Sequence, residues 1–439
     1  MINRAPSIPL LRQRPFRMLS YTRFTSRTAT NAINFALILL IVDQTGKAFM
    51  SALLVLTLVV PGTVAGLAAG AVADSFPKRP IIFLANMLRA GVCLLFVLQG
   101  GGVAVFFMVA IVMATITQFA SSAEGALMPA VVARGDLARA NAIGHAVAGT
   151  AQILGFVVLT PIALRLFDSP RILFAACAAL YLFAAFPALL IGRHSNAARL
   201  ELGGRSRSPW YSAGWHEMLR DPRILNAAIE LTLIATAMII LGGLIPIYIK
   251  DTLGLPVEIG AIVLMPAALG VVLGLRLANY LAHRVPTATL STTGFALFVV
   301  LLSLLTFVDK EAEFVAGYGA FSWIGAVQLG SFDGAGVLAM FFVMPLGFSY
   351  ALVAVAGQTV LNDLVPLHLQ GRVLATQGAL AAMASSVPVL VAGALTDVIG
   401  VTAVMAMVAV AIGVAAVANL RAPGRRRSTP EIVQRVKSH

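Results

Sequence analysis

Several polar side chains interrupt a long apolar stretch near the start of this sequence. Arg27, Asn31 and Asn34 follow one another at i, i+4 and i+7, and Arg23 lies one turn earlier. On a helix this spacing places all four along one face. Ionisable groups are costly in lipid, so this face is expected to point into protein or water. Two interpretations remain open: the stripe lines a water-filled cavity, or it makes hydrogen bonds between helices.

Two opposite charges lie in the third and fourth apolar stretches. Arg89 and Glu124 are expected at similar depth in neighbouring helices. They form either a structural ion pair or a gate that switches with protonation. If transport is coupled to protons, a carboxylate must meet a different environment in each state. Arg89 is the expected partner of Glu124, which favours Glu124 as the coupling acid.

Glu230 is the carboxylate that lies well inside an apolar stretch of the second half, near Thr236. It is either a proton site or the partner of Arg223 or Arg276. No acid falls near the midpoint of an apolar stretch, where a coupling ion is usually carried. A cavity lined by apolar groups, hydroxyls, amides and arginines suits an amphipathic or anionic substrate better than a sugar or a small cation.

The composition excludes an ordinary soluble protein. Of 439 residues, 59% are hydrophobic and 11% are charged, and the mean hydropathy is +0.92. Soluble domains are closer to half apolar and a quarter charged. The net charge of +13 arises from basic residues between apolar runs. Lipid head groups are therefore the expected acidic partner, and nucleic acid is not.

The hydrophobic pattern predicts an all-α integral membrane protein with twelve transmembrane helices in two pseudo-symmetric halves of six. A span requires about 20 apolar residues. The predicted domains are an N-terminal half over 1–192, a cytoplasmic linker over 193–223, a C-terminal half over 224–420 and a basic cytoplasmic tail over 421–439. The predicted spans are 21–43, 48–73, 80–100, 102–124, 140–165, 172–192, 224–249, 258–282, 287–308, 334–360, 373–396 and 400–420.

The basic residues predict the orientation. With both termini on the same side, 22 Lys and Arg residues fall on that side and five on the other. Cytoplasmic loops carry such an excess, so both termini are expected in the cytoplasm and the chain in the plasma (inner) membrane. Segment 309–333 contains several aromatic residues among glycines, and is predicted to be an external loop with an interfacial aromatic segment.

The loop after the second predicted span contains a recognisable motif. Gly70, Asp74, Lys78 and Arg79 resemble the G-x-x-x-D-x-x-G-[RK]-[RK] signature of the major facilitator superfamily, although Pro77 replaces the second glycine. The resemblance implies transport by two six-helix halves. It also implies that these residues belong to a cytoplasmic gate, to which we add two further arginines in short motifs before later spans, Arg139 and Arg372.

Other stretches are similar to one branch of this superfamily. Met128-Pro129, Leu137 to Ala142 and Gln370 to Val373 resemble the branch that holds macrolide-type efflux pumps and the enterobactin exporter. Lysophospholipid transporters come close around Ala73 to Phe76. Proton-coupled exporters usually have a glycine-proline-glycine pattern in the fifth span. Here Gly155 is followed by Phe-Val-Val-Leu, which argues against proton antiport.

These observations leave several functions open. The first is a secondary transporter that exports an amphipathic small molecule by alternating access, with proton antiport as an added feature. The alternatives are a lipid or lysophospholipid flippase, or a uniporter, without proton coupling. A third class, a receptor or scaffold that does not transport, predicts a sizeable soluble domain. An enzyme is not expected, because the six His are scattered and there is no nucleophile elbow or phosphate loop. We expect a monomer without cofactor or metal, in contact with membrane lipids.

Overall fold

The computed structural model describes residues 10–132, 136–167, 169–191, 210–256, 260–281, 284–311 and 334–420. These residues form helices joined by short turns, and none of them forms a strand. Most of the predicted aromatic segment 309–333 and all of the basic tail 421–439 lie outside the described residues, as does the first part of the linker.

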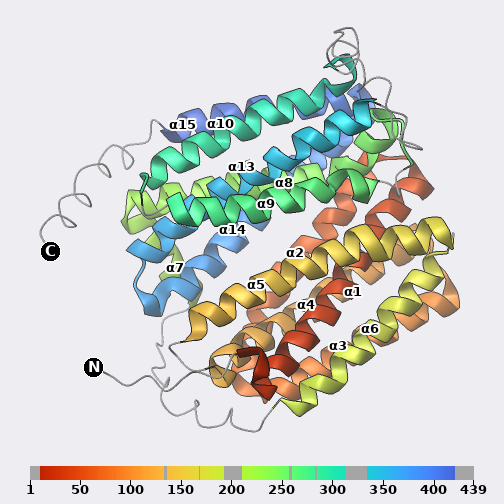
Figure 1. Cartoon of the computed structure of the whole chain (residues 1–439), viewed down its shortest axis with the longest axis vertical. Coiled ribbons are helices and arrows are strands. Elements are labelled where there is room, and N and C mark those ends of the chain that lie inside the picture. The colour runs from red at the N-terminus through yellow and green to blue at the C-terminus, as the bar shows by residue number, and fades with distance from the viewer. Residues whose placement is uncertain are drawn as a thin grey trace, which may run out of the picture. The chain divides into compact units, whose positions relative to one another are not determined.

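The chain divides into two compact units. Unit 1 contains residues 1–44 and 57–206, and unit 2 contains residues 45–56 and 207–439. In unit 1, α3 packs against both α4 and α6 (Figure 1). The described helices of this unit are η1 Leu10–Arg12, α1 Arg14–Thr45, α2 Ala48–Ser75, α3 Lys78–Gln99, α4 Val103–Val131, α5 Leu137–Ile153 and α6 Pro170–Leu190.

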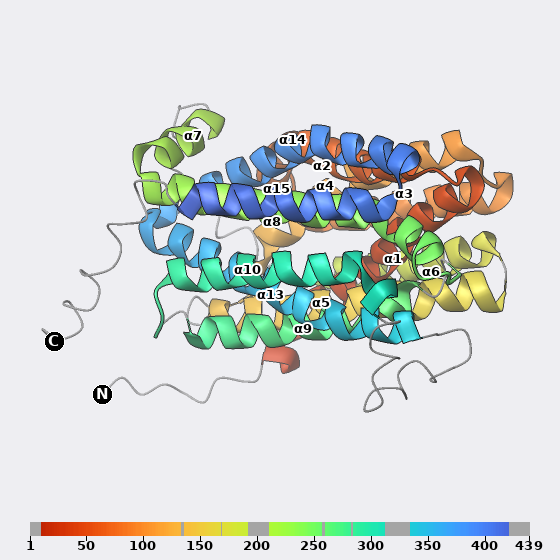
Figure 2. The same ribbon diagram turned by 90° about the horizontal axis from the view of Figure 1, so that it is seen from above.

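Unit 2 also includes the first turns of α2. Its helices pack in neighbouring pairs, with α13 against α8, α9 and α10, and α15 against α8 and α10 (Figure 2). They are α7 Trp210–Arg220, α8 Pro222–Asp251, α9 Gly260–Leu281, α10 Thr287–Thr306, α13 Gly334–Leu364, α14 Leu367–Ile399 and α15 Val401–Leu420.

The predicted all-helical architecture of twelve spans is confirmed. Ten described helices are long and apolar enough to cross a membrane, and shorter apolar stretches lie at Ala48–Gly62 and Ile262–Ala278. Several helices extend beyond the predicted spans, most clearly α1, α4 and α14. Hydropathy detects only the part of a helix inside the hydrocarbon, whereas the backbone hydrogen bonds continue into the polar region.

The fifth span changes its helical type at Leu154, next to Gly155. After α5 the chain continues in the π-helical turns η3 Leu154–Leu159 and η4 Ile162–Leu166. Thr160 Oγ1 lies 2.9 Å from the carbonyl oxygen of Gly155 and 3.2 Å from that of Ala32 on α1. A Cβ added at Gly155 would lie 2.7 Å from the carbonyl oxygen of Thr28. Gly155 therefore permits α1 and the fifth span to touch backbone to backbone.

One helix was missed by the sequence analysis. The linker was predicted as a polar stretch, but its end forms α7. Met218 is fully buried in an apolar cluster with Ile224, Leu361 and Val365, whereas Leu219 is exposed. A helix of this length is too short to span a membrane, so it gave no hydropathy signal.

Small residues allow α9 and α13 to cross at close range. A Cβ added at Gly270 would overlap the carbonyl oxygen of Met344, and one added at Gly347 would overlap that of Ala267. Both obstacles are backbone atoms, which cannot rotate out of the way. Membrane helices commonly use glycines for such contacts.

We expect Gly270→Ala to destabilise unit 2, because the added methyl group must push α13 away. Overpacking of this kind costs about 1–3 kcal/mol. The expected result is a lower Tm of the purified protein in detergent. Gly242→Ala on α8 is the matched control, because no atom lies within 4 Å of the added Cβ. Equal Tm values for the two variants would contradict the close contact.

Candidate functional site

Short polar contacts hold α1 against α6. Thr22 Oγ1 donates to the carbonyl oxygen of Ala184 at 3.1 Å, and Thr30 Oγ1 lies 2.9 Å from the hydroxyl of Tyr181. Tyr181 is fully buried. Because α1 also touches the fifth span at Gly155, its rotation about its own axis is fixed. The direction in which its arginines point follows from these contacts.

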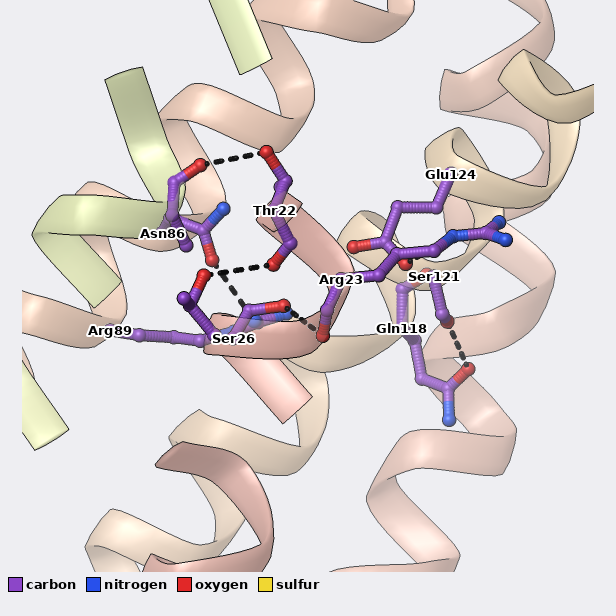
Figure 3. A network of polar contacts seen from close by, with 10 residues as sticks. Thr22, Arg23, Ser26, Asn86, Arg89, Gln118, Ser121 and Glu124 are labelled. Atoms are coloured by element: carbon purple, nitrogen blue, oxygen red, sulfur yellow. Dashed lines mark hydrogen bonds and ion pairs between the residues drawn. The ribbon is translucent and has the colours of Figure 1, made fainter. Parts of the chain in front are cut away.

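A buried ion pair joins α1 to α4. Arg23 Nε lies 3.2 Å from Glu124 Oε2, and only 14% and 5% of the two side chains are exposed. Figure 3 shows the two side chains meeting between the helices. At such burial each charge depends on the other, because removal of one leaves the other uncompensated in an apolar setting.

Arg89 on α3 is held differently from what the sequence predicted. Its guanidinium donates to Asn86 Oδ1 at 3.3 Å, and lies over the ring of Tyr181 at 5.4 Å from the centroid. The side chain that forms the ion pair with Glu124 is that of Arg23. The prediction that Arg89 is the ion-pair partner of Glu124 is therefore wrong. Similar depth in neighbouring helices did not reveal that α1 supplies a nearer guanidinium.

The surroundings of Arg89 leave polar atoms unsatisfied. Arg89 Nε and Asn86 Nδ2 are both buried and have no hydrogen-bond partner among the described residues (Figure 3). Such groups are rare in native proteins and call for an explanation. Here Glu124 attracts Arg89 and Arg27 repels it. Arg89 therefore interacts with charges of both signs.

Arg27 is the accessible member of this cluster. It is exposed, and it makes no hydrogen bond or ion pair with another described residue. Electrostatic repulsion links it to both Arg23 and Arg89. Among the described side chains of the cluster, three arginines thus face a single carboxylate, Glu124.

The polar stripe of α1 continues from Arg27. Asn31 and Asn34 are half-buried, whereas Leu37 on the neighbouring face is fully buried. A Cβ added at Gly155 would lie 3.0 Å from the Cβ of Asn31, so the Asn31 side chain borders the fifth span. The structure therefore keeps Arg27, Asn31 and Asn34 on the more accessible side of α1. Whether this side lines a substrate cavity stays a prediction.

Sequence reasoning missed some polar residues on α4. Ser121 Oγ, one turn before Glu124, donates to the backbone carbonyl oxygen of Gln118 at 3.1 Å. Figure 3 shows its second contact, with Gln118 Oε1 at 3.5 Å. A Cβ added at Gly62 would lie 3.0 Å from Gln118 Nε2, so the Gln118 side chain packs against Gly62 on α2. The signal was present as a polar face with i, i+3 and i+6 spacing in an apolar stretch, the pattern already noted on α1.

Glu230 lies in a second polar cluster, within unit 2. Its Oε2 accepts a hydrogen bond from Ser291 at 2.6 Å and its Oε1 accepts one from Asn419 at 3.1 Å. All three side chains are buried. The suggested cation Arg223 makes an ion pair with Asp221 at 3.0 Å, and Arg276 is exposed. Thr236, two turns further along α8, is half-buried.

The predicted cytoplasmic gate is described only in part. Gly70, Lys78 and Arg79 are half-buried and Arg139 is exposed. The side chains of Asp74 and Arg372 lie outside the described ones. Lys78 begins α3, directly after Pro77, whose fixed φ favours a helix start. The gate network itself stays a prediction.

Solved structures with the same fold are transporters. A mutant of the nucleoside transporter NupG aligns with a TM-score of 0.74 and 12% identity, over 92% of this chain and 99% of that one. A bacterial homolog of the human lysosomal transporter Spinster aligns with a TM-score of 0.69 and 14% identity, over 94% and 97%. A bacterial homologue of the iron transporter ferroportin aligns with a TM-score of 0.64 and 14% identity, over 94% of this chain and 100% of that one. At these identities the likeness concerns the fold alone.

No curated protein matches the sequence. The family model of the Major Facilitator Superfamily matches residues 19–345, which is most of the chain. This match agrees with the motif around Asp74 and with the twelve-helix architecture. The chain is a multi-pass membrane protein and a transporter, and it belongs to the major facilitator superfamily.

Proposed function

We propose that this protein is a secondary transporter that exports an amphipathic small molecule with an anionic group by alternating access. The observation that carries the proposal is the accessible Arg27 inside a cluster of three arginines and one carboxylate. A cation left without a counter-charge at this depth is costly. A substrate anion would supply the missing charge.

Charge-assisted hydrogen bonds support an anion as the ligand. A guanidinium presents a planar fork that matches carboxylate, sulfonate or phosphate oxygens. Asn31 and Asn34 add amide donors one and two turns further along α1. The rest of α1 and its neighbours are mostly apolar, which favours a substrate with an apolar body. Thr236 on α8 is proposed as a further candidate for contact with the substrate.

Export as the direction of transport is supported by the resemblance to macrolide efflux pumps and the enterobactin exporter. The first alternative is a lysophospholipid or lipid flippase, or a uniporter, because such carriers need no proton-binding acid and the proline-containing pattern after Gly155 is missing. A receptor or scaffold has less support, since the family and the similar structures are those of transporters.

The proposed setting follows from the distribution of basic residues. Both termini and the linker 193–223 face the cytoplasm, the halves extend over 1–192 and 224–420, and the protein acts as a monomer in the plasma (inner) membrane. Lys78, Arg79 and Arg139 then lie at the cytoplasmic ends of their helices, where cations interact favourably with anionic lipids.

We expect Arg27→Gln to weaken substrate binding about tenfold or more, because a hydrogen bond to a charged group is lost. The measurement is uptake into proteoliposomes of paired amphiphiles that differ only in an anionic or neutral head group. The loss is expected for the anionic member alone. Arg171→Gln is the control, because this exposed arginine lies in the first turn of α6, outside the cluster. Full uptake of the anionic member by Arg27→Gln would overturn the proposed site.

If a proton is coupled, Glu124→Gln is expected to abolish the response to a pH gradient and to leave counterflow intact. Protonation of Glu124 must break its ion pair with Arg23, so the pair changes with the transport state. Glu230→Gln is expected to retain the gradient response. If both variants respond fully to the pH gradient, neither acid couples transport to protons, and the result favours a uniporter or a flippase.

A stability control accompanies this experiment. Breaking a buried ion pair by removing one member costs about 3–5 kcal/mol, whereas removing both charges costs less. The double variant Arg23→Gln/Glu124→Gln is therefore expected to have a higher Tm than Glu124→Gln alone. This order of Tm values shows whether lost coupling in Glu124→Gln reflects chemistry or unfolding.

We propose that Asp74, Lys78 and Arg79 form the cytoplasmic gate, with Gly70, Arg139 and Arg372 beside it. Asp74→Asn keeps the shape of the side chain and removes its charge, so it should slow transport while expression and Tm stay unchanged. Turnover measured in proteoliposomes at saturating substrate checks this expectation. Wild-type turnover would remove Asp74 from the gate.

A further inference from the structure

The first turn of α2 is capped from a distant helix. Asp397, near the end of α14, accepts hydrogen bonds from the backbone nitrogens of Ala48 at 2.7 Å and Phe49 at 3.1 Å, one with each carboxylate oxygen. These nitrogens are among the four that a helix cannot satisfy at its own start. The negative charge also interacts favourably with the positive end of the helix dipole.

Glycines create the surface on which these turns lie. A Cβ added at Gly393 on α14 would lie 2.6 Å from the Cβ of Ala52 and 3.0 Å from the Cα of Phe49. One added at Gly243 on α8 would lie 3.2 Å from the Cα of Ala52. Ala48, Ser51 and Ala52 are accordingly buried. The start of α2 thus rests on helix backbone, with Asp397 at its tip.

The remainder of α2 belongs to unit 1. Residues 45–56 cluster with unit 2, and the helix joins unit 1 from Thr57 onward. Pro61 follows within one turn of this change. A proline inside a helix removes one hydrogen bond and is a common cause of bending. The helix therefore contains a bending point just beyond the part that Asp397 holds.

We propose that Asp397 is a latch: it fastens the first turns of α2 to α14 in one transport state and releases them in the other. The latch rests on the proposed alternating-access function and orientation, which put these helix ends on the external side. The carboxylate makes two directional hydrogen bonds, and release also requires Ala48, Ser51 and Ala52 to leave their buried positions. Closure of the external end is then tied to a single carboxylate.

The latch is tested by the accessibility of a buried reporter. Ser51 is fully buried and its hydroxyl has no hydrogen-bond partner among the described residues, so Ser51→Cys is a conservative change. The reagent is a membrane-impermeant maleimide added from outside to proteoliposomes without substrate. Cys93 and Cys177 are both buried, and the parent chain without the reporter measures their background.

In the reporter chain, Asp397→Ala is expected to speed labelling about 2- to 30-fold, the range for loss of a helix cap. Asp397→Asn should give a smaller increase, because its oxygen still accepts one hydrogen bond but the charge is gone. Gly393→Ala should also speed labelling, because the added methyl group displaces α2. Asp251→Ala is the matched control, since this exposed carboxylate ends α8 in the same unit.

Unchanged labelling in Asp397→Ala, or an equal increase in Asp251→Ala, overturns the latch. If the alanine variant does not fold, Asp397→Asn replaces it in the test, because asparagine has nearly the shape of aspartate. Unchanged labelling in both Asp397→Asn and Gly393→Ala then overturns the latch as well. The assay uses no substrate, so its result is independent of substrate chemistry. Full uptake of the anionic member by Arg27→Gln, with the latch variants behaving as expected, would overturn only the proposed substrate.

Discussion

The cost of placing guanidinium groups within an apolar helix bundle shapes the N-terminal half of this transporter. Arg23 is compensated by Glu124 at 3.2 Å, and Arg89 by an amide oxygen and the face of an aromatic ring. The ion pair joins α1 to α4 and the ring contact joins α3 to α6, whereas Asn86 lies on α3 itself. Arg27 has no such compensation from described residues. The same constraint that organises the bundle therefore leaves one cation available for a ligand.

Close backbone contacts provide the second organising feature. Gly155 lets the fifth span touch α1, Gly270 and Gly347 let α9 touch α13, and Gly393 lets α14 touch the start of α2. Without a hydrophobic drive between helices in lipid, such packing and hydrogen bonds carry much of the association energy. Contacts of this kind hold well at fixed distance and are lost quickly when helices separate. They are compatible with the alternating access that we propose.

Most of the fold was predictable because spans are long and apolar, and hydropathy detects such segments directly. α7 was missed because a short amphipathic helix gives no such signal. The residues of the candidate site could be predicted, because the spacing indicated Arg23, Arg27, Arg89 and Glu124. The ion pair between them could not, because the choice of Arg23 as the partner of Glu124 depends on the rotation of α1 about its axis. That rotation is set by Thr22, Thr30 and Gly155, whose contacts with other helices leave no trace in spacing along one helix.

The cap on α2 illustrates a limit of a different kind. Asp397 is separated from Ala48 by 349 residues, and a carboxylate at the end of a predicted span reads as an ordinary solvated end. Its role as a helix cap becomes visible only in the structure, where α2 begins at the carboxylate oxygens of Asp397. The ion pair of Arg23 with Glu124 and the cap of Asp397 also differ in consequence. The ion pair is buried and costly to break while both groups are charged, whereas Asp397 is exposed and can exchange its hydrogen bonds with water at a lower cost. The proposed release at the start of α2 thus depends on the weaker of these two interactions.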